Sequence, residues 1–398
     1  MKKRFLRDIA EIQTGPFGSQ LHKEDYVDVG TPIVTVEHLG CRVFSEQNLP
    51  MVSDTDKSRL SKYVLKKGDI VFSRVGSVDR CSFVGQKHDG WMFSGRCLRV
   101  RPSEEVDSLF LYYFFCLNTT KEFVRSIAVG ATMPSINTKL LGEVEVVCPE
   151  IEEQRKIADI LSKIDDKIEE NQKINENLLE QATALFDNAL QQSESISFVE
   201  LGSLADVKGG KRLPKGVNLI TKPNSHPYIR VRDLNNMIFA SLSSDYEYVD
   251  DETQKSIARY ITSAGDVLVS IVGTIGLTAI VDDTLDNANL TENCVKLTNL
   301  KGITPEYLLL FLRSKIGVES INKGTVGAVQ LKLPIKNIQS IPVPLLMSVE
   351  MQALSDILSI MFNRISANII ETKRLSELRD VLLPKLISGE LSVSDINY

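Results

Sequence analysis

The 398-residue sequence predicts an α/β (α+β) protein of two similar mixed domains, separated by a long antiparallel two-helix coiled coil and related by a pseudo-twofold internal repeat. Three observations predict this fold class. The two halves share a colinear series of segments, each half contains short strand-forming runs, and each half ends in a seven-residue apolar period. The repeat is far longer than the roughly 20 to 50 residues of solenoid units, so it indicates two domains rather than an array.

The duplication is visible at a constant offset of 197 residues. Gly68–Val71 returns as Gly265–Leu268, and Asp159–Ser162 returns as Asp356–Ser359. Upstream the offset is 195, where Thr31–Ile33 corresponds to His226–Tyr228, as a small loop insertion would produce. The sequence thus divides into a first domain (1–150), a central helix (151–197), a second domain (198–347) and a C-terminal helix (348–398).

Within each domain, short apolar runs separated by Gly and Asp predict strands. The runs are Ile33–Val36, Asp69–Phe72 and Cys97–Val100, and in the second copy Tyr228–Val231 and Val267–Ser270. A helix follows in both copies, over Leu109–Leu117 and Tyr307–Leu312. The second of these begins after Thr304-Pro305-Glu306, which supplies an N-cap, a first-turn proline and a first-turn acid.

From Glu152 to about Ala189 the apolar period becomes seven residues. The predicted seam residues are Ile157, Leu161, Ile164, Ile168, Leu178, Ala182, Leu185 and Ala189, and in the second copy Leu354, Leu358, Met361, Ile365, Thr372, Leu375, Leu382 and Leu386. Asn171 and Asn368 are polar breaks at the same heptad, and Arg379 interrupts the second seam. The matched register favours a coiled coil in which these asparagines fix the pairing. The alternative is that each helix lies on its own domain.

Charge is unevenly distributed along the chain. The net charge of −6 arises from the helices, because residues 151–197 carry 5 basic and 11 acidic side chains. Residues 1–150 carry 20 and 19, and residues 198–347 carry 16 and 15, so each domain is at +1. Nucleic-acid binding by either domain would therefore need local basic patches rather than a strong overall field.

Composition excludes several classes of protein. No run of about 18 apolar residues predicts a membrane span, and the N-terminus has no uninterrupted apolar signal region. The six cysteines show no Cys-x-x-Cys spacing, which fits reduced thiols and a cytoplasmic location. The four histidines are dispersed, so we expect no metal site. Because no membrane span is predicted, we also expect no membrane partner.

In this order, the duplicated segments resemble the specificity subunits of type I restriction-modification systems. The similarity covers essentially the whole chain and is carried by Gly15–Ser19, Lys67–Ile70, Val129–Asn137, Pro149–Ala158 and Leu382–Leu391. The second copy departs from it where Gln330-Leu331-Lys332 replaces Met133-Pro134-Ser135. The second domain's loop is therefore expected to make different contacts.

The resemblance implies two target recognition domains, each binding one half of a bipartite, asymmetric double-stranded DNA site, with the coiled coil setting the spacing. It implies a chain without chemistry of its own, which recruits two methyltransferase subunits and restriction/translocase subunits. This chain would bind no cofactor, since S-adenosylmethionine and ATP would belong to the partner subunits.

Two loops are the first candidates for DNA contact. The Gly-rich loop Thr14–Lys23 and its counterpart Lys208–Gly216 combine glycines with polar or basic side chains, which suit phosphates and base edges. Their candidate residues are Ser19, Gln20 and Lys23, and Lys208, Lys211, Arg212 and Lys215. The alternative is a pair of ordinary surface turns.

A second group follows the strand near residue 70. Arg74, Ser77 and Arg80 surround a glycine that both copies share, whereas the second copy has Ile271, Thr274 and Leu277. A recognition surface should keep its glycine and change its side chains. The remaining candidates are Arg96, Thr132, Ser135, Asn137, Arg230, Arg232 and Thr274. Arg96, Arg230 and Arg232 could equally be solvated charges, and Thr132, Ser135 and Asn137 could cap the following helix.

Catalytic motifs are not recognisable. Asn48–Met51 lacks the second proline and the aromatic residue of an amino-methyltransferase loop. The segment around Lys208–Arg212 is not a P-loop, because Ala205 stands where the first glycine should be and Arg212 replaces the Ser or Thr. We therefore expect no enzyme activity from this chain alone. Two alternatives stay open: a DNA methyltransferase or nuclease with an unrecognised site, and a coiled-coil interaction protein without DNA binding.

Overall fold

The computed structural model describes residues 2–16, 18, 20–235, 237–327 and 330–393. Its contacts divide the chain into two compact units, Met1–Glu170 with Glu371–Tyr398, and Asn171–Ile370. Each unit therefore holds one mixed domain and part of both long helices. The four-segment division made from the sequence stays a prediction, since the units divide the helices internally.

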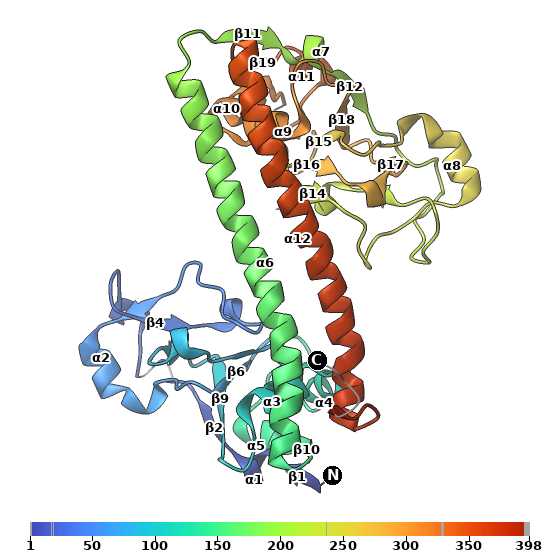
Figure 1. Ribbon diagram of the computed structural model, residues 1–398. Coiled ribbons are helices and arrows are strands. Elements are labelled where there is room, and N and C mark those ends of the chain that lie inside the picture. The colour runs from blue at the N-terminus through green and yellow to red at the C-terminus, as the bar shows by residue number, and fades with distance from the viewer. Residues whose placement is uncertain (1, 17, 19, 236, 328–329, 394–398) are drawn as a thin grey trace. The chain divides into compact units, whose positions relative to one another are not determined.

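The first unit's domain contains two four-stranded sheets, in the orders β2-β9-β6-β7 and β3-β5-β4-β8, and the pair β1-β10. Strands β2, β9 and β6 of the first sheet are labelled in Figure 1. Its elements are β1 (Lys2–Phe5), α1 (Leu6–Ile9), β2 (Ala10–Thr14), η1 (Lys23–Asp25), β3 (Tyr26–Val27), β4 (Thr31–Val34), η2 (Val36–His38), β5 (Met51–Val52), α2 (Asp54–Arg59), η3 (Ser61–Tyr63), β6 (Ile70–Ser73), β7 (Cys81–Phe83), η4 (Gln86–His88), β8 (Met92–Phe93), β9 (Cys97–Pro102), α3 (Ser108–Cys116), α4 (Asn118–Ser126), α5 (Thr138–Gly142) and β10 (Glu145–Cys148).

The second unit's domain contains a five-stranded sheet, β12-β18-β15-β16-β14, and the pairs β13-β17 and β11-β19. Its elements are β11 (Ser197–Glu200), α7 (Leu201–Leu204), β12 (Asp206–Gly209), β13 (Tyr228–Ile229), η5 (Val231–Leu234), β14 (Phe239–Ala240), α8 (Asp251–Ile257), η6 (Ala258–Tyr260), β15 (Val267–Ser270), β16 (Thr278–Val281), η7 (Asp283–Leu285), β17 (Asn289–Leu290), β18 (Cys294–Thr298), α9 (Pro305–Arg313), α10 (Lys315–Gly324), α11 (Ile335–Gln339) and β19 (Pro342–Leu345).

The internal repeat is confirmed element by element. At the offset of 197, β6 corresponds to β15, β7 to β16, α3 to α9 and β10 to β19. The glycine before the central strand has a structural reason, since Gly68 and Gly265 adopt positive φ angles of 92° and 84°. Every residue of the strand that follows is buried in both units. The helix after the sheet begins with a side-chain cap in each case, from Asp107 and from Thr304.

Two long helices complete the fold, α6 (Ile151–Gln192) and α12 (Ser348–Ser388), and within each unit they pack antiparallel. In the first unit Ile157 and Leu161 share a core with Leu383 and Leu386. In the second unit Ala182 and Phe186 share a core with Leu358 and Phe362. The predicted coiled coil is therefore confirmed.

The polar asparagines that interrupt the apolar seam lie in the interior of the coiled coil. Asn368 is 1% exposed and its Nδ2 donates a hydrogen bond to Asn175 Oδ1 at 2.8 Å. Asn171 is fully buried. A buried amide that must find its partner disfavours shifted registers, as predicted for these two positions.

The prediction that Leu185 lies in the seam is wrong. Leu185 is 38% exposed, and the neighbouring Phe186 is fully buried, with its ring 5.1 Å from that of Tyr307. Adjacent helical residues point about 100° apart, so the two side chains face different surroundings. The larger aromatic side chain takes the interior position because it buries more apolar surface.

Candidate nucleic-acid interface

Most of the candidate residues that follow strand β6 gather on one surface. We call this surface the first loop cluster, made of residues 73–80, 94–96 and 129–136. Its backbone is tied together by hydrogen bonds from Arg74 N to Arg96 O at 2.8 Å, from Ile136 N to Arg74 O at 2.9 Å and from Gly76 N to Pro134 O at 2.8 Å. Residues far apart in the sequence thus form one rigid frame.

The side chains of this cluster differ in availability. Ser77, Arg96 and Thr132 are exposed. Arg74 is half-buried, with Nη1 donating to the Gly95 carbonyl at 3.1 Å, and Ser135 Oγ donates to the Val129 carbonyl at 3.2 Å. Asn137 accepts a hydrogen bond from Leu140 N and caps α5, which was the alternative interpretation for this residue.

The N-terminal loop is anchored to the protein. Gln20 Oε1 accepts a hydrogen bond from Tyr63 Oη at 2.7 Å, and Lys23 lies in the short turn η1. Ser19 lies outside the described residues. The close approach of the backbone at Ser94 requires a glycine at position 15, because a Cβ on Gly15 would lie 2.1 Å from the Ser94 carbonyl oxygen. A Cβ on its counterpart Gly210 would likewise lie 2.0 Å from the Thr291 carbonyl oxygen.

The second unit repeats this frame with other side chains. The second loop cluster comprises residues 270–277, 291–293, 326–327 and 330–333. Its backbone is held by hydrogen bonds from Ile271 N to Asn293 O at 2.8 Å and from Leu333 N to Ile271 O at 3.0 Å. Thr274, predicted from the sequence, is exposed here, and so is Lys332.

The candidate residues chosen from the sequence did not include Asn293 and Lys332. They are the counterparts of Arg96 and Ser135 at the offset of 197, and Lys332 forms the same bridges to the neighbouring loops that Ser135 forms. Applying the offset to every candidate of the first domain would have found both. Each cluster thus presents a basic side chain at a different place on the same frame.

The basic loop Lys208–Gly216 is partly neutralised by acids. Arg212 Nε pairs with Glu292 at 2.7 Å, and Lys208 pairs with Asp206 at 3.2 Å. Burial alone would raise the pKa of Glu292, but the hydrogen bond from Arg212 leaves it below its usual value. Lys211 and Lys215 are exposed, and Lys211 lies 5.5 Å from the centre of the Tyr260 ring.

The remaining candidate arginines differ from one another. Arg80 is exposed, and its guanidinium donates to the carbonyl of Leu39. Arg230 is largely buried between Glu247 and Asp233, whereas the side chain of Arg232 is 61% exposed. Arg230 therefore has a ready structural role. Arg232 also lies 3.5 Å from both Asp233 and Glu247, but its exposed side chain can reach solvent.

In the described part of the chain there is no group of three possible metal ligands and no helix that could cross a membrane. Burial raises the pKa of the equivalent thiols Cys97 and Cys294 to about 12 in each case, so neither is a ready nucleophile.

Comparison with known proteins agrees with this geometry. The sequence model described as "Type I restriction modification DNA specificity domain" matches residues 1–180 and 194–379. The chain is 22% identical to the HindI specificity subunit of Haemophilus influenzae, over 90% of this chain and 92% of that protein. It is 24% identical to the MjaIX specificity subunit of Methanocaldococcus jannaschii, over 98% and 93%.

A solved structure shares the fold. The S subunit of a type I restriction-modification system from M. genitalium aligns with a TM-score of 0.62 at 18% identity, over 97% of this chain and 95% of that one.

Proposed function

The chain belongs to the type I restriction-modification DNA specificity family, and on that basis we propose that it recognises DNA through two separate surfaces, one in each unit. The observation that carries this proposal is the pair of loop clusters. They share a backbone frame, while Ser77, Arg96 and Ser135 in the first become Thr274, Asn293 and Lys332 in the second. Two frames with different side chains suit two different half-sites, since base edges are read by side-chain hydrogen bonds.

The site is accordingly bipartite and asymmetric, and α6 and α12 set its spacing. The family match does not favour the alternatives of an unrecognised enzyme or an interaction protein without DNA binding. We propose that the chain is non-catalytic. Its sequence carries no recognisable motif of a methyltransferase or nuclease, so the catalytic work falls to partner subunits.

The partners proposed are two methyltransferase subunits and, in the restriction complex, restriction/translocase subunits. S-adenosylmethionine and ATP bind to those partners rather than to this chain. An apolar stripe on α12 in the second unit supports a protein partner, because Val349, Ile357 and Ile360 are 79%, 46% and 70% exposed. A cytoplasmic location fits the six cysteines, all of which are unpaired.

Mapping of methylated bases tests the proposed function. Cells without other modification systems would express the chain with a type I methyltransferase subunit, and the genome would be sequenced for modified adenines and cytosines. We expect one split motif whose two halves differ and whose methylation disappears when the chain is omitted. A palindromic motif would contradict the two-reader arrangement, and methylation independent of the chain would contradict recognition.

A further inference from the structure

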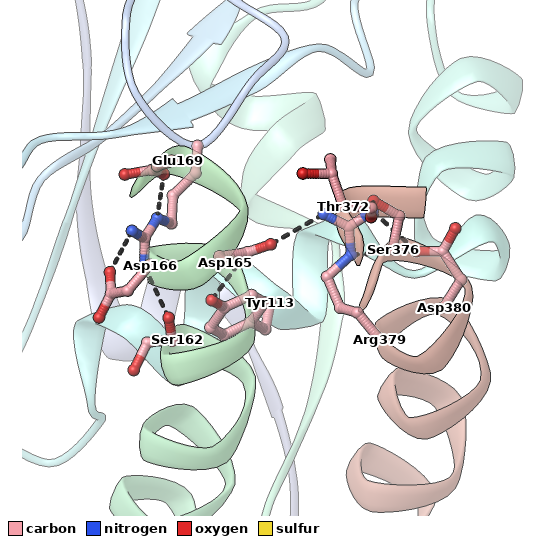
Figure 2. A network of polar contacts seen from close by, with 10 residues as sticks. Tyr113, Ser162, Asp165, Asp166, Glu169, Thr372, Ser376, Arg379 and Asp380 are labelled. Atoms are coloured by element: carbon pink, nitrogen blue, oxygen red, sulfur yellow. Dashed lines mark hydrogen bonds and ion pairs between the residues drawn. The ribbon is translucent and has the colours of Figure 1, made fainter. Parts of the chain in front are cut away.

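Arg42 links a loop of the first domain to helix α6. Its side chain is 13% exposed, and Nε donates to Glu169 Oε1 at 2.7 Å. The guanidinium also pairs with Asp166 and reaches the Ser162 carbonyl at 3.4 Å, so three acceptors within two turns of α6 hold one side chain. Figure 2 labels these acceptors, Ser162, Asp166 and Glu169. Burial alone would lower the pKa of Arg42, but the hydrogen bonds to Glu169 and Asp166 raise it, which keeps the guanidinium charged.

The backbone beside Arg42 is tied to β7, the strand that begins directly after Arg80. Phe83 N, on β7, donates to the Arg42 carbonyl at 2.8 Å. Ser82 Oγ donates to the Cys41 carbonyl at 2.6 Å and accepts from Gly40 N at 3.1 Å. Arg80 closes the link by donating to the Leu39 carbonyl. Residues 39–42 therefore join a predicted DNA-contacting arginine to α6.

The second unit makes the corresponding contact without charge. The bond from Phe83 N to the Arg42 carbonyl recurs as a bond from Ile280 N to the Ile238 carbonyl at 2.9 Å, which makes Ile238 the counterpart of Arg42. Beside it, the ring of Phe239 packs edge-on against Phe362 of α12, with ring centres 6.3 Å apart. Phe362 stands where Asp165 stands in the first copy.

The difference has a geometric consequence. An apolar contact is non-directional, whereas a guanidinium held by two carboxylates and a carbonyl fixes both distance and angle. A lysine could keep the charge but not the fork of donors. The first unit thus fixes its loop to the helix at one defined pose.

We propose that Arg42 is a positioning residue, which sets the pose of the Arg80 surface on α6 and thereby the spacer length that the chain accepts. This inference rests on the proposed function, since it assumes a bipartite site whose spacing depends on the helices. It assigns no base contact to Arg42 itself.

The test measures binding of the full chain, assembled with its methyltransferase subunit, to duplexes carrying the motif found by methylation mapping. The spacer would be of native length, one base pair shorter and one base pair longer. We expect Arg42→Met to weaken binding at the native spacer by about tenfold, the size of one charge-assisted hydrogen bond, and to reduce the preference over the altered spacers. Base preference within both half-sites should be unchanged.

Matched variants make the result specific. Arg42→Lys should recover part of the spacer preference, and Arg155→Met, which removes an exposed arginine of α6 paired with Glu152, should behave as wild type. If Arg42→Met does not fold, the pair Asp166→Asn and Glu169→Gln removes both carboxylate charges of the same contact from the helix side and should give the same spacer phenotype.

Three results would overturn the positioning role: wild-type spacer preference in the Arg42→Met protein, wild-type preference in the paired acid variant, or altered base preference at a half-site. The result for the wild-type chain distinguishes failure of the positioning role from failure of the proposed function. A wild-type chain that binds no bipartite motif contradicts the function, whereas normal wild-type binding with an unaffected Arg42→Met variant contradicts only the inference.

Discussion

Arg379 and Asp165 form an ion pair in the first unit, with Nη1 of the arginine 2.8 Å from Oδ1 of the carboxylate (Figure 2). The other oxygen, Oδ2, accepts a hydrogen bond from Tyr113 Oη at 2.8 Å. Burial, together with the charge of Asp165, raises the pKa of Tyr113, so its hydroxyl remains a donor. Arg379, which interrupts the predicted apolar seam, is thus matched by a buried acid on the opposing helix.

Arg379→Ala should lower the free energy of unfolding by about 2 kcal/mol, because it leaves Asp165 buried with a single partner. Urea denaturation of the full chain measures this loss. Arg364→Ala, at an exposed arginine of the same helix, should change stability by less than about 0.5 kcal/mol.

The second repeat suggests how to remove the charge without that loss. Leu310, Phe362 and Ala182 stand where Tyr113, Asp165 and Arg379 stand. The triple variant Tyr113→Leu, Asp165→Phe, Arg379→Ala should therefore be more stable than Arg379→Ala alone, since no buried charge is left without a partner. A triple variant as unstable as the sum of its single changes would refute this explanation.

Gly15→Ala should destabilise the first unit by about 2 kcal/mol, because the added Cβ would meet the Ser94 carbonyl oxygen at 2.1 Å and the chain must shift. Gly18→Ala is the matched control in the same loop, since a Cβ there meets nothing within 4 Å. Thermal unfolding of the two variants decides the point. Equal melting temperatures would mean that the Gly15 backbone relaxes freely.

Glu292→Gln should tighten DNA binding by about twofold to fivefold, because Arg212 would no longer divide its charge between the carboxylate and a phosphate. Glu319→Gln changes the net charge equally at an exposed position elsewhere in the same unit and is the control. Binding would be measured at a fixed salt concentration. A similar gain in both variants would indicate a general charge effect rather than release of Arg212.

The same ion pair should make stability depend on pH. The pKa of Glu292 in the folded protein is below its ordinary value of 4.5, so its stabilisation is complete above pH 4.5. It is lost as the pH falls through the folded-state pKa. The stability difference between wild type and Glu292→Gln should accordingly be constant between pH 6 and pH 8 and shrink below about pH 4.5. A difference that grows on acidification would contradict the pairing.

Much of the fold could be predicted from the sequence because it depends on local pattern. The repeat offset, the glycine before β6 and the heptad register are all properties of short segments. Arg379 could be recognised as an intruder in the same way. Its partner could not, because a buried Asp165 looks like any other acid of a charged helix until the opposing helix is in place.

The candidate surface was less predictable for the same physical reason. Hydrogen bonds between loops bring Arg74, Arg96 and Ser135 together, and a sequence does not show such tertiary contacts. Arg230 and Arg212 are of a residue type that commonly contacts DNA, yet both have acidic partners within the protein. Leu185 was misassigned because the choice between two adjacent apolar residues is made by the core that receives them.

One alanine substitution in each loop cluster tests most directly the central claim that each unit reads its own half-site. Arg96→Ala and Lys332→Ala would each be assayed for methylation of duplexes in which one half-site at a time carries altered bases. We expect Arg96→Ala to relax selectivity at one half-site only and Lys332→Ala to relax it at the other, because each residue lies on a separate frame. If either substitution reduced selectivity equally at both half-sites, the two surfaces would not be separate readers.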